Sequence, residues 1–180
     1  MKKFALAVAI AATGVSAPAM AQDTDLGGPF IGVVGGYDLV SLEIDSTNDV
    51  TRDDGLLYGV TAGYDVDTGT GIIGIEAEAS GTTLSDDIAD AGLDLYGGVR
   101  AGLQIDAVGM VYGKVGYSTV DIDLDENLDG IRLGAGYERR FGGFFGRLEY
   151  RYTTYDVSDT IDDDLNGNRN QIVLVLGGKF

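Results

Sequence analysis

Apolar and polar side chains alternate along most of the chain, and the alternation is sharpest near its end. From residue 144 to 154, one side of an extended strand would carry Phe144, Leu148, Tyr150 and Tyr152, and the other Arg147, Glu149, Arg151 and Thr153. The final stretch, QIVLVLGGKF, continues this pattern and ends at Phe180. The inner face of a soluble sheet does not hold so many charges. The pattern therefore favours an apolar face that meets lipid and a charged face that lines a narrow closed interior.

The same period of two recurs in eight segments. The expected strands are residues 29–40, 55–66, 72–82, 92–105, 110–119, 130–141, 144–154 and 171–180. The connections after the second, fourth and sixth strands are a few residues long, whereas the others run to roughly ten or more, an asymmetry that outer-membrane barrels share. The sequence thus predicts an all-β fold: a transmembrane eight-stranded antiparallel up-and-down β-barrel with short periplasmic turns and longer extracellular loops, including polar loops at 41–54, 120–129 and 155–169.

Aromatic residues should mark both edges of the lipid-facing band. Near the short turns we expect Phe141, Phe144 and Phe180, and towards the other edge the tyrosines Tyr37, Tyr58, Tyr117 and Tyr152.

The amino terminus indicates export. Lys2 and Lys3 precede an apolar run, and small residues at Ala19 and Ala21 follow it, which is the pattern of a cleaved secretory signal peptide. We expect residues 1–21 to form the signal peptide, 22–28 a short periplasmic lead, and 29–180 the barrel. The apolar run is too short to span a bilayer, and no later segment approaches the roughly 20 apolar residues of a transmembrane helix.

Most charged residues of the strands should point inward by the parity of their positions. The predicted interior charge network comprises Asp38, Asp65, Glu76, Glu78, Arg100, Lys114, Arg132, Glu138, Arg140, Arg147, Glu149, Arg151 and Lys179, and Asp94 shares their side. Arg139 is the exception and should face lipid near the periplasmic edge. Because buried charge is costly unless it is paired, and because eight strands enclose room only for side chains, we expect a cross-linked polar core rather than an open pore.

Composition excludes several functions. The formal charge of −17 would become about −19 once Lys2 and Lys3 leave with the signal, which argues against nucleic-acid partners. The chain has no Cys and no His, so disulfides, a Ser-His pair and imidazole metal sites are absent. Gly69, Gly71 and Gly74 match GxGxxG but run from a turn into a strand, where a dinucleotide site needs a helix. We therefore expect no enzyme activity, no catalytic residues and no cofactor.

Acidic residues gather in two of the loops expected at the extracellular end. These are Asp121, Asp123 and Asp125 in one loop and Asp162, Asp163 and Asp164 in another. Carboxylate clusters suit hard cations such as Mg²⁺ and Ca²⁺, so weak binding that ties the loops to anionic lipopolysaccharide is one hypothesis. Plain solvated loops are an equally good interpretation.

With its signal peptide, alternating strands and inward charges, the chain resembles the small outer-membrane barrels of Gram-negative bacteria, such as the OmpA transmembrane domain, OmpX and the opacity-protein-like surface antigens. In that family the last strand carries an assembly signal, which Ile172, Leu174, Leu176 and Phe180 match, whereas Gly178 departs from it. The resemblance implies an integral outer-membrane protein whose partners are membrane lipid, lipopolysaccharide and the barrel assembly machinery, and a monomer. It also implies a surface-exposed structural or adhesion protein, with a small porin-like channel of low conductance as the alternative.

Overall fold

The structure, a computed structural model, describes residues 26–44, 49–83, 91–122, 126–156 and 166–180. At positions 40–53, 91–92, 121–122, 126–128, 156 and 166–167 it describes the backbone alone.

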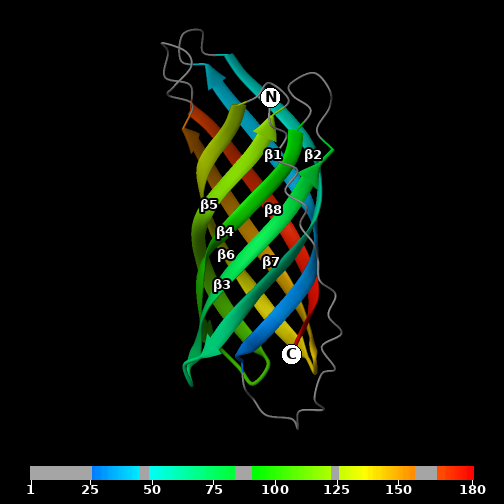
Figure 1. Ribbon diagram of the computed structural model, residues 1–180, viewed down its shortest axis with the longest axis vertical. Helices are drawn as coiled ribbons and strands as arrows, with labels where there is room; N and C mark the ends of the chain where they lie inside the picture. Colours follow the sequence, from blue (N-terminus) through cyan, green and yellow to red (C-terminus); the bar gives the residue numbers. More distant parts are fainter. Residues whose placement is uncertain (1–25, 45–48, 84–90, 123–125, 157–165) are drawn as a thin grey trace, which may run out of the picture.

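Eight antiparallel strands close into a single barrel (Figure 1). They are β1 (Gly28–Ile44), β2 (Asp49–Asp67), β3 (Gly71–Thr82), β4 (Ala91–Gln104), β5 (Gly109–Ile122), β6 (Glu126–Phe141), β7 (Phe144–Asp156) and β8 (Asn166–Lys179). Each strand pairs with the next in sequence, and β8 pairs with β1 to complete the ring. The up-and-down topology predicted from the alternating pattern is confirmed. Within the described ranges, no helix has the length and apolar character needed to cross a membrane.

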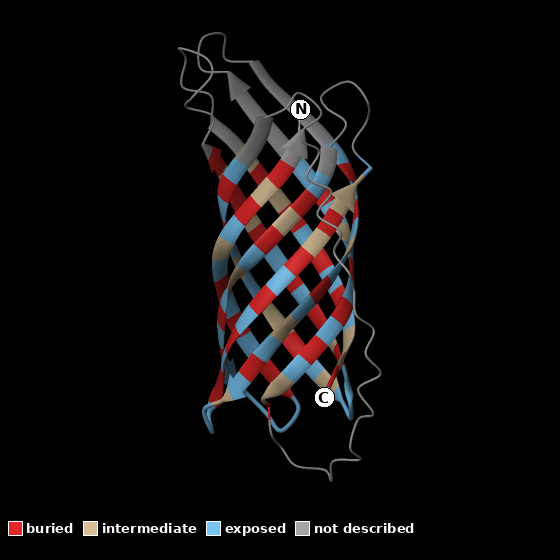
Figure 2. Ribbon diagram, viewed as in Figure 1, coloured by how far each residue is buried: buried red, intermediate tan, exposed pale blue. Residues whose placement is uncertain are grey.

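Burial alternates along every strand, as Figure 2 shows by its red and pale blue bands. In β3, Ile73 and Ile75 are 60% and 63% exposed, whereas Glu76 and Glu78 are buried. An apolar side chain this exposed would be unfavourable in water but not against lipid. The sequence alternation therefore fixes the face of each strand, because a slip of one residue would turn every charge towards the lipid.

Three predicted loops are shorter than the sequence pattern suggested. The predicted loop at 41–54 is largely strand, since β1 and β2 stay paired up to Ile44 and Asp49. Likewise β5 and β6 pair up to Ile122 and Glu126 in the predicted loop 120–129, and β7 and β8 extend into 155–169. Backbone ladders need no apolar side chains, and a strand crosses the membrane in about 9–11 residues. The strands therefore continue beyond the apolar band into the polar stretches.

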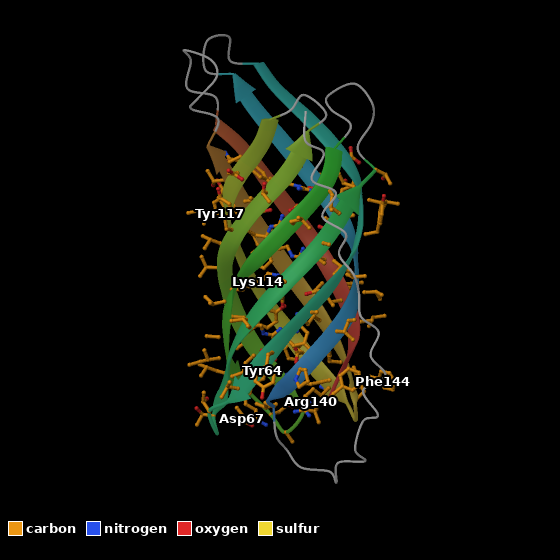
Figure 3. All side chains as sticks on the ribbon, in the orientation of Figure 1. Tyr64, Asp67, Lys114, Tyr117, Arg140 and Phe144 are labelled. Carbon is orange, nitrogen blue, oxygen red and sulfur yellow. The ribbon has the colours of Figure 1, made fainter. Side chains whose placement is uncertain are left out.

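Aromatic side chains lie outside the barrel near both ends of the apolar band. Phe141, Phe144 and Phe180 are exposed at the end with the short turns, where Figure 3 labels Phe144. Towards the other end, Tyr37, Tyr58 and Tyr117 are exposed and Tyr152 is half-buried. The Tyr37 hydroxyl donates to Asp54, and the Tyr152 hydroxyl donates to Asn168 at 2.8 Å. Each of these tyrosines has its ring against the apolar band and its hydroxyl in a polar contact, which suits a membrane–water boundary.

Candidate functional site

The inward positions of the strands hold a cluster of ionised side chains, here called the ionic core. Its bases are Arg100, Lys114, Arg132, Arg147, Arg151, Arg169 and Lys179, and its acids are Asp38, Asp65, Glu76, Glu78, Asp94, Glu138 and Glu149. All of them are buried, and all eight strands contribute at least one. The two signs are equal in number, so the interior charge of these residues is neutral.

Glu76 of β3 stands at the centre of the ionic core. Its carboxylate accepts from Lys114 Nζ at 2.7 Å, from Arg147 at 2.7 Å and from Arg100 at 3.4 Å. The three bases come from β5, β7 and β4, so this one carboxylate joins walls of the barrel that are not neighbours in sequence. Charge-assisted hydrogen bonds of this length are the stronger kind.

Towards the periplasmic end the network continues through Glu138 of β6. Its Oε2 accepts from Arg100 at 2.9 Å and from Arg147 at 2.7 Å. Lys179 lies 3.8 Å from the other oxygen of Glu138 and donates to Asp65 at 2.7 Å. Arg100 Nε lies 3.3 Å from Asp65, which closes this part of the core into a ring of alternating sign.

Towards the extracellular end the network runs through Glu149. Lys114 Nζ lies 2.7 Å from this carboxylate, Arg151 also pairs with it, and both terminal nitrogens of Arg151 donate to Glu78 at 2.6 and 2.7 Å. Glu78 and Arg132 are 3.9 Å apart, the longest separation in the chain of pairs.

Beyond that separation, Asp94 accepts from Arg132 at 2.5 Å and from Arg169 at 2.8 Å. Arg169 also pairs with Asp38 of β1. Ion pairs therefore follow one another without interruption from Asp38 near one end of the membrane band to Asp65 near the other.

Aromatic rings fill the space between these charges. Arg147 lies 4.6 Å from the Phe30 ring centroid and 4.7 Å from that of Phe145, and the two rings meet edge to face at 5.9 Å. Arg100 lies 4.6 Å from the ring of Tyr112, whose hydroxyl donates to Glu149. A cation over an aromatic face is attracted by the ring quadrupole, so these rings stabilise the bases as well as occupying volume.

Glycines in the wall make room for the rings. A Cβ at Gly63 would overlap the Phe30 ring and the carbonyl oxygen of Ile75, and one at Gly177 would overlap the Phe145 ring. Both rings therefore lie flat against backbone, which leaves the middle of the barrel to the ionic core.

The structure brings together twelve of the thirteen residues predicted for the interior network. Arg140 lies apart from them, half-buried on the last turn of β6 beside the short Gly142-Gly143 hairpin, where Figure 3 labels it. Arg139 is exposed and lies within 3.4 Å of the Tyr137 hydroxyl. The arginine at the periplasmic edge thus faces outward with a polar contact.

Sequence reasoning missed Arg169 and the two phenylalanine rings. Arg169 fell in a stretch interpreted as loop, although it shares the parity of the inward residues Gln171 and Lys179. Phe30 and Phe145 likewise share the parity of Asp38 and Arg147. Extending the strands by parity, instead of ending them where the apolar band ends, would have found all three.

The acidic residues of the cation hypothesis lie outside the described residues, except Asp121, of which the backbone alone is described in β5. In the part of the chain that the structure describes, no group of three or more His, Cys, Asp or Glu side chains could hold a metal ion.

One serine inside the barrel touches a carboxylate. Ser118 donates to Asp94 at 2.6 Å, but the serine is fully buried and Asp94 is bound to two arginines. A carboxylate held this way is a poor base, and a substrate has no approach to the hydroxyl. The arrangement suits a fixed structural role.

The closed barrel with lipid-facing apolar side chains defines an integral membrane β-barrel protein. The family model for the outer membrane protein beta-barrel domain matches residues 7–180, so the chain belongs to that family and is an integral protein of the outer membrane. No curated protein matches the chain.

Solved structures show the same fold. Neisserial surface protein A (NspA) is similar at a TM-score of 0.61 and 13% identity, with 85% of this chain and 97% of that chain covered. Ail, the attachment invasion locus protein of Yersinia pestis, is similar at a TM-score of 0.47 and 16% identity, with 85% and 99% covered. The N-terminal β-barrel domain of Pseudomonas aeruginosa OprF is similar at 0.43 and 12%, with 84% and 98% covered.

Proposed function

We propose that this protein is a non-enzymatic outer-membrane barrel that acts as a surface-exposed structural or interaction protein, adhesion included, and that its interior is closed to solutes. The observation that carries the proposal is the ionic core, in which buried acids and bases from all eight strands pair along the membrane band. An ion entering the barrel would have to break such pairs, and each buried charge left without its partner costs several kcal/mol.

The parts beyond the apolar band are then the ones that a partner can reach. The pairing of β1 with β2 continues past the Tyr37 level to Ile44 and Asp49, and β8 pairs with β1 up to Glu43. Strands and loops at this end rise from a rigid base, which is how binding segments are held in many proteins. A role in structure or recognition at the cell surface uses this end, whereas a role in transport would use the filled interior.

The lipid-facing surface supports the proposed partners: outer-membrane lipid, lipopolysaccharide and the assembly machinery, with the protein as a monomer. Ile172, Leu174, Leu176 and Phe180 of the assembly signal are all more than half exposed on the outer face. At Gly178, where the family's signal has a bulky residue, a Cβ would lie 3.4 Å from the Phe180 ring. The terminal ring thus covers the position that the glycine leaves open.

Planar-bilayer recordings on the refolded chain without residues 1–21 test the proposal. We expect no steady unit conductance, because the paired core leaves ions no continuous path. The Tyr96→Ala/Tyr112→Ala variant, which removes two interior rings, shows that the assay registers a widened interior. Steady unit openings of the unmodified barrel would reject the closed interior and favour a small porin-like channel of low conductance.

A further inference from the structure

The residue before β1 closes the periplasmic end of the barrel. Leu26 precedes the first strand, yet its side chain is 2% exposed and packs in one cluster with Ile72 and Met110. Those two residues are the first inward side chains of β3 and the second inward position of β5, next to the short turns. They are apolar although the interior above them is ionic, so the chain offers an apolar seat at this end.

The backbone of Leu26 is held as firmly as its side chain. Its N–H donates to Asp67 Oδ2 at 2.8 Å, and its carbonyl oxygen accepts from Lys179 Nζ at 2.6 Å. Lys179 is also the last base of the ionic core, paired with Asp65 at 2.7 Å. One residue is thus bound at three points, by β2, by β8 and by the apolar pair on β3 and β5.

Gly28 explains how the chain reaches this seat. Its φ of +111° is a conformation that side-chain-bearing residues rarely adopt, and a Cβ there would overlap the carbonyl oxygen of Phe180. The glycine lets the chain leave the barrel end and enter β1 directly. Beside it, the N–H of Phe180 donates to the carbonyl of Pro29 at 2.9 Å, which joins the two ends of the barrel's sequence.

We propose that residues 26–28 form a mouth strap: a segment whose Leu26 occupies a built site at the periplasmic mouth and seals the ionic core from periplasmic water. The strap lies outside the ladder of the barrel, so it can be displaced without unpairing a strand. Its seat recognises an extended backbone that carries one apolar side chain, by one carboxylate acceptor, one ammonium donor and an apolar pair. The barrel's own lead fills that seat.

Thiol accessibility tests the strap, because the chain has no cysteine of its own. Met110→Cys places one thiol beneath Leu26, and a membrane-impermeant maleimide is added to the refolded barrel in detergent. We expect slow labelling in the Met110→Cys background, and labelling at least tenfold faster when Leu26→Gly is added. Leu26→Met is the matched control, since it keeps an apolar side chain of similar volume, and it should leave the rate near that of the unmodified strap.

Two further cysteines separate a displaced strap from a loosened barrel. Thr70→Cys, in the exposed turn between β2 and β3, should label fast with or without Leu26→Gly. Val173→Cys, fully buried on β8, should stay slow in both. Equal rates at position 110 with and without Leu26→Gly would overturn the proposal, as would fast labelling before the change. A rise at position 173 alongside 110 would also overturn it, because the variant would then have opened the barrel wall.

Discussion

The carboxylate of Glu76 should be among the most sensitive single groups in the barrel. Three bases, Lys114, Arg147 and Arg100, lie at 2.7, 2.7 and 3.4 Å from it. Glu76→Gln keeps the size of the side chain but removes its charge, so the three cations face each other with less compensation. The amide can still accept hydrogen bonds, which means that the variant reports mainly on charge.

The expected loss of unfolding free energy follows from the burial of all four groups, whose side chains are at most 1% exposed. Removing one partner of a buried pair typically costs about 3–5 kcal/mol, because the other charge stays buried. Lys114 and Arg147 keep second acids in Glu149 and Glu138, which places the expectation near the lower end, about 3 kcal/mol.

Urea titrations of the refolded barrel in detergent, followed by circular dichroism, measure this loss. Asp129→Asn is the matched control: it makes the same chemical change on an exposed side chain and should shift stability by about 0.5 kcal/mol or less. Combining Glu76→Gln with Lys114→Met should cost less than the sum of the two single changes, as coupled neighbours do. A loss below about 1 kcal/mol for Glu76→Gln, or strict additivity in the double variant, would refute the idea that these charges stabilise one another.

Four further outcomes are expected. Arg169→Met should destabilise the barrel by about 3 kcal/mol in the same urea titration, because Asp38 and Asp94 lose a shared base, whereas Arg139→Met on the outer face should be near neutral; equal effects would contradict the assignment. Gly63→Ala should cost about 1–3 kcal/mol through overlap with the Phe30 ring, while Gly113→Ala, whose Cβ would meet its first neighbour at 3.8 Å, should not. The pKa of Asp106 should lie below its ordinary value because the N–H groups of Val108 and Gly109 donate to its carboxylate, so its support of the turn is complete above the unfolded pKa and is lost as pH falls through the folded one; an NMR titration that finds an unshifted pKa would contradict this. If the acidic loops bind divalent cations, calorimetric titration with millimolar Ca²⁺ should give heat that disappears when Asp162, Asp163 and Asp164 are all changed to Asn, and heat that survives the change would reject the hypothesis.

The barrel could be predicted from the sequence because its two faces meet such different surroundings. Lipid and a closed interior impose opposite requirements, so a period of two is written plainly in segments such as 72–82. The same contrast gave the direction of each charge, and the structure places Glu138, Glu149 and Arg151 inside as their parity indicated. Pairing partners did not follow from parity. Which base meets Glu76 depends on the stagger of strands around the ring, and that geometry is not local in the sequence.

The features that escaped prediction lie where the lipid contrast fades. Beyond the apolar band both faces of a strand meet polar surroundings, so nothing in the pattern distinguishes the ends of β1, β2, β6 and β8 from loops, and Arg169 was hidden there. Leu26 was equally invisible, because a single apolar residue in a short lead has no periodicity. Its role depends on the seat formed by Ile72, Met110, Asp67 and Lys179, which come from four different strands.

The account rests on a dry, paired interior, and exchange of guanidinium protons tests it most directly. In the refolded barrel transferred to deuterated buffer, NMR would follow the Nε–H signals of the arginines. The account predicts that the Nε–H of Arg147, which donates to Glu138 at 2.7 Å and lies 2% exposed, persists far longer than that of the exposed Arg139. Exchange of Arg147 as fast as that of Arg139 would mean that water moves freely through the barrel, and the closed ionic core would be wrong.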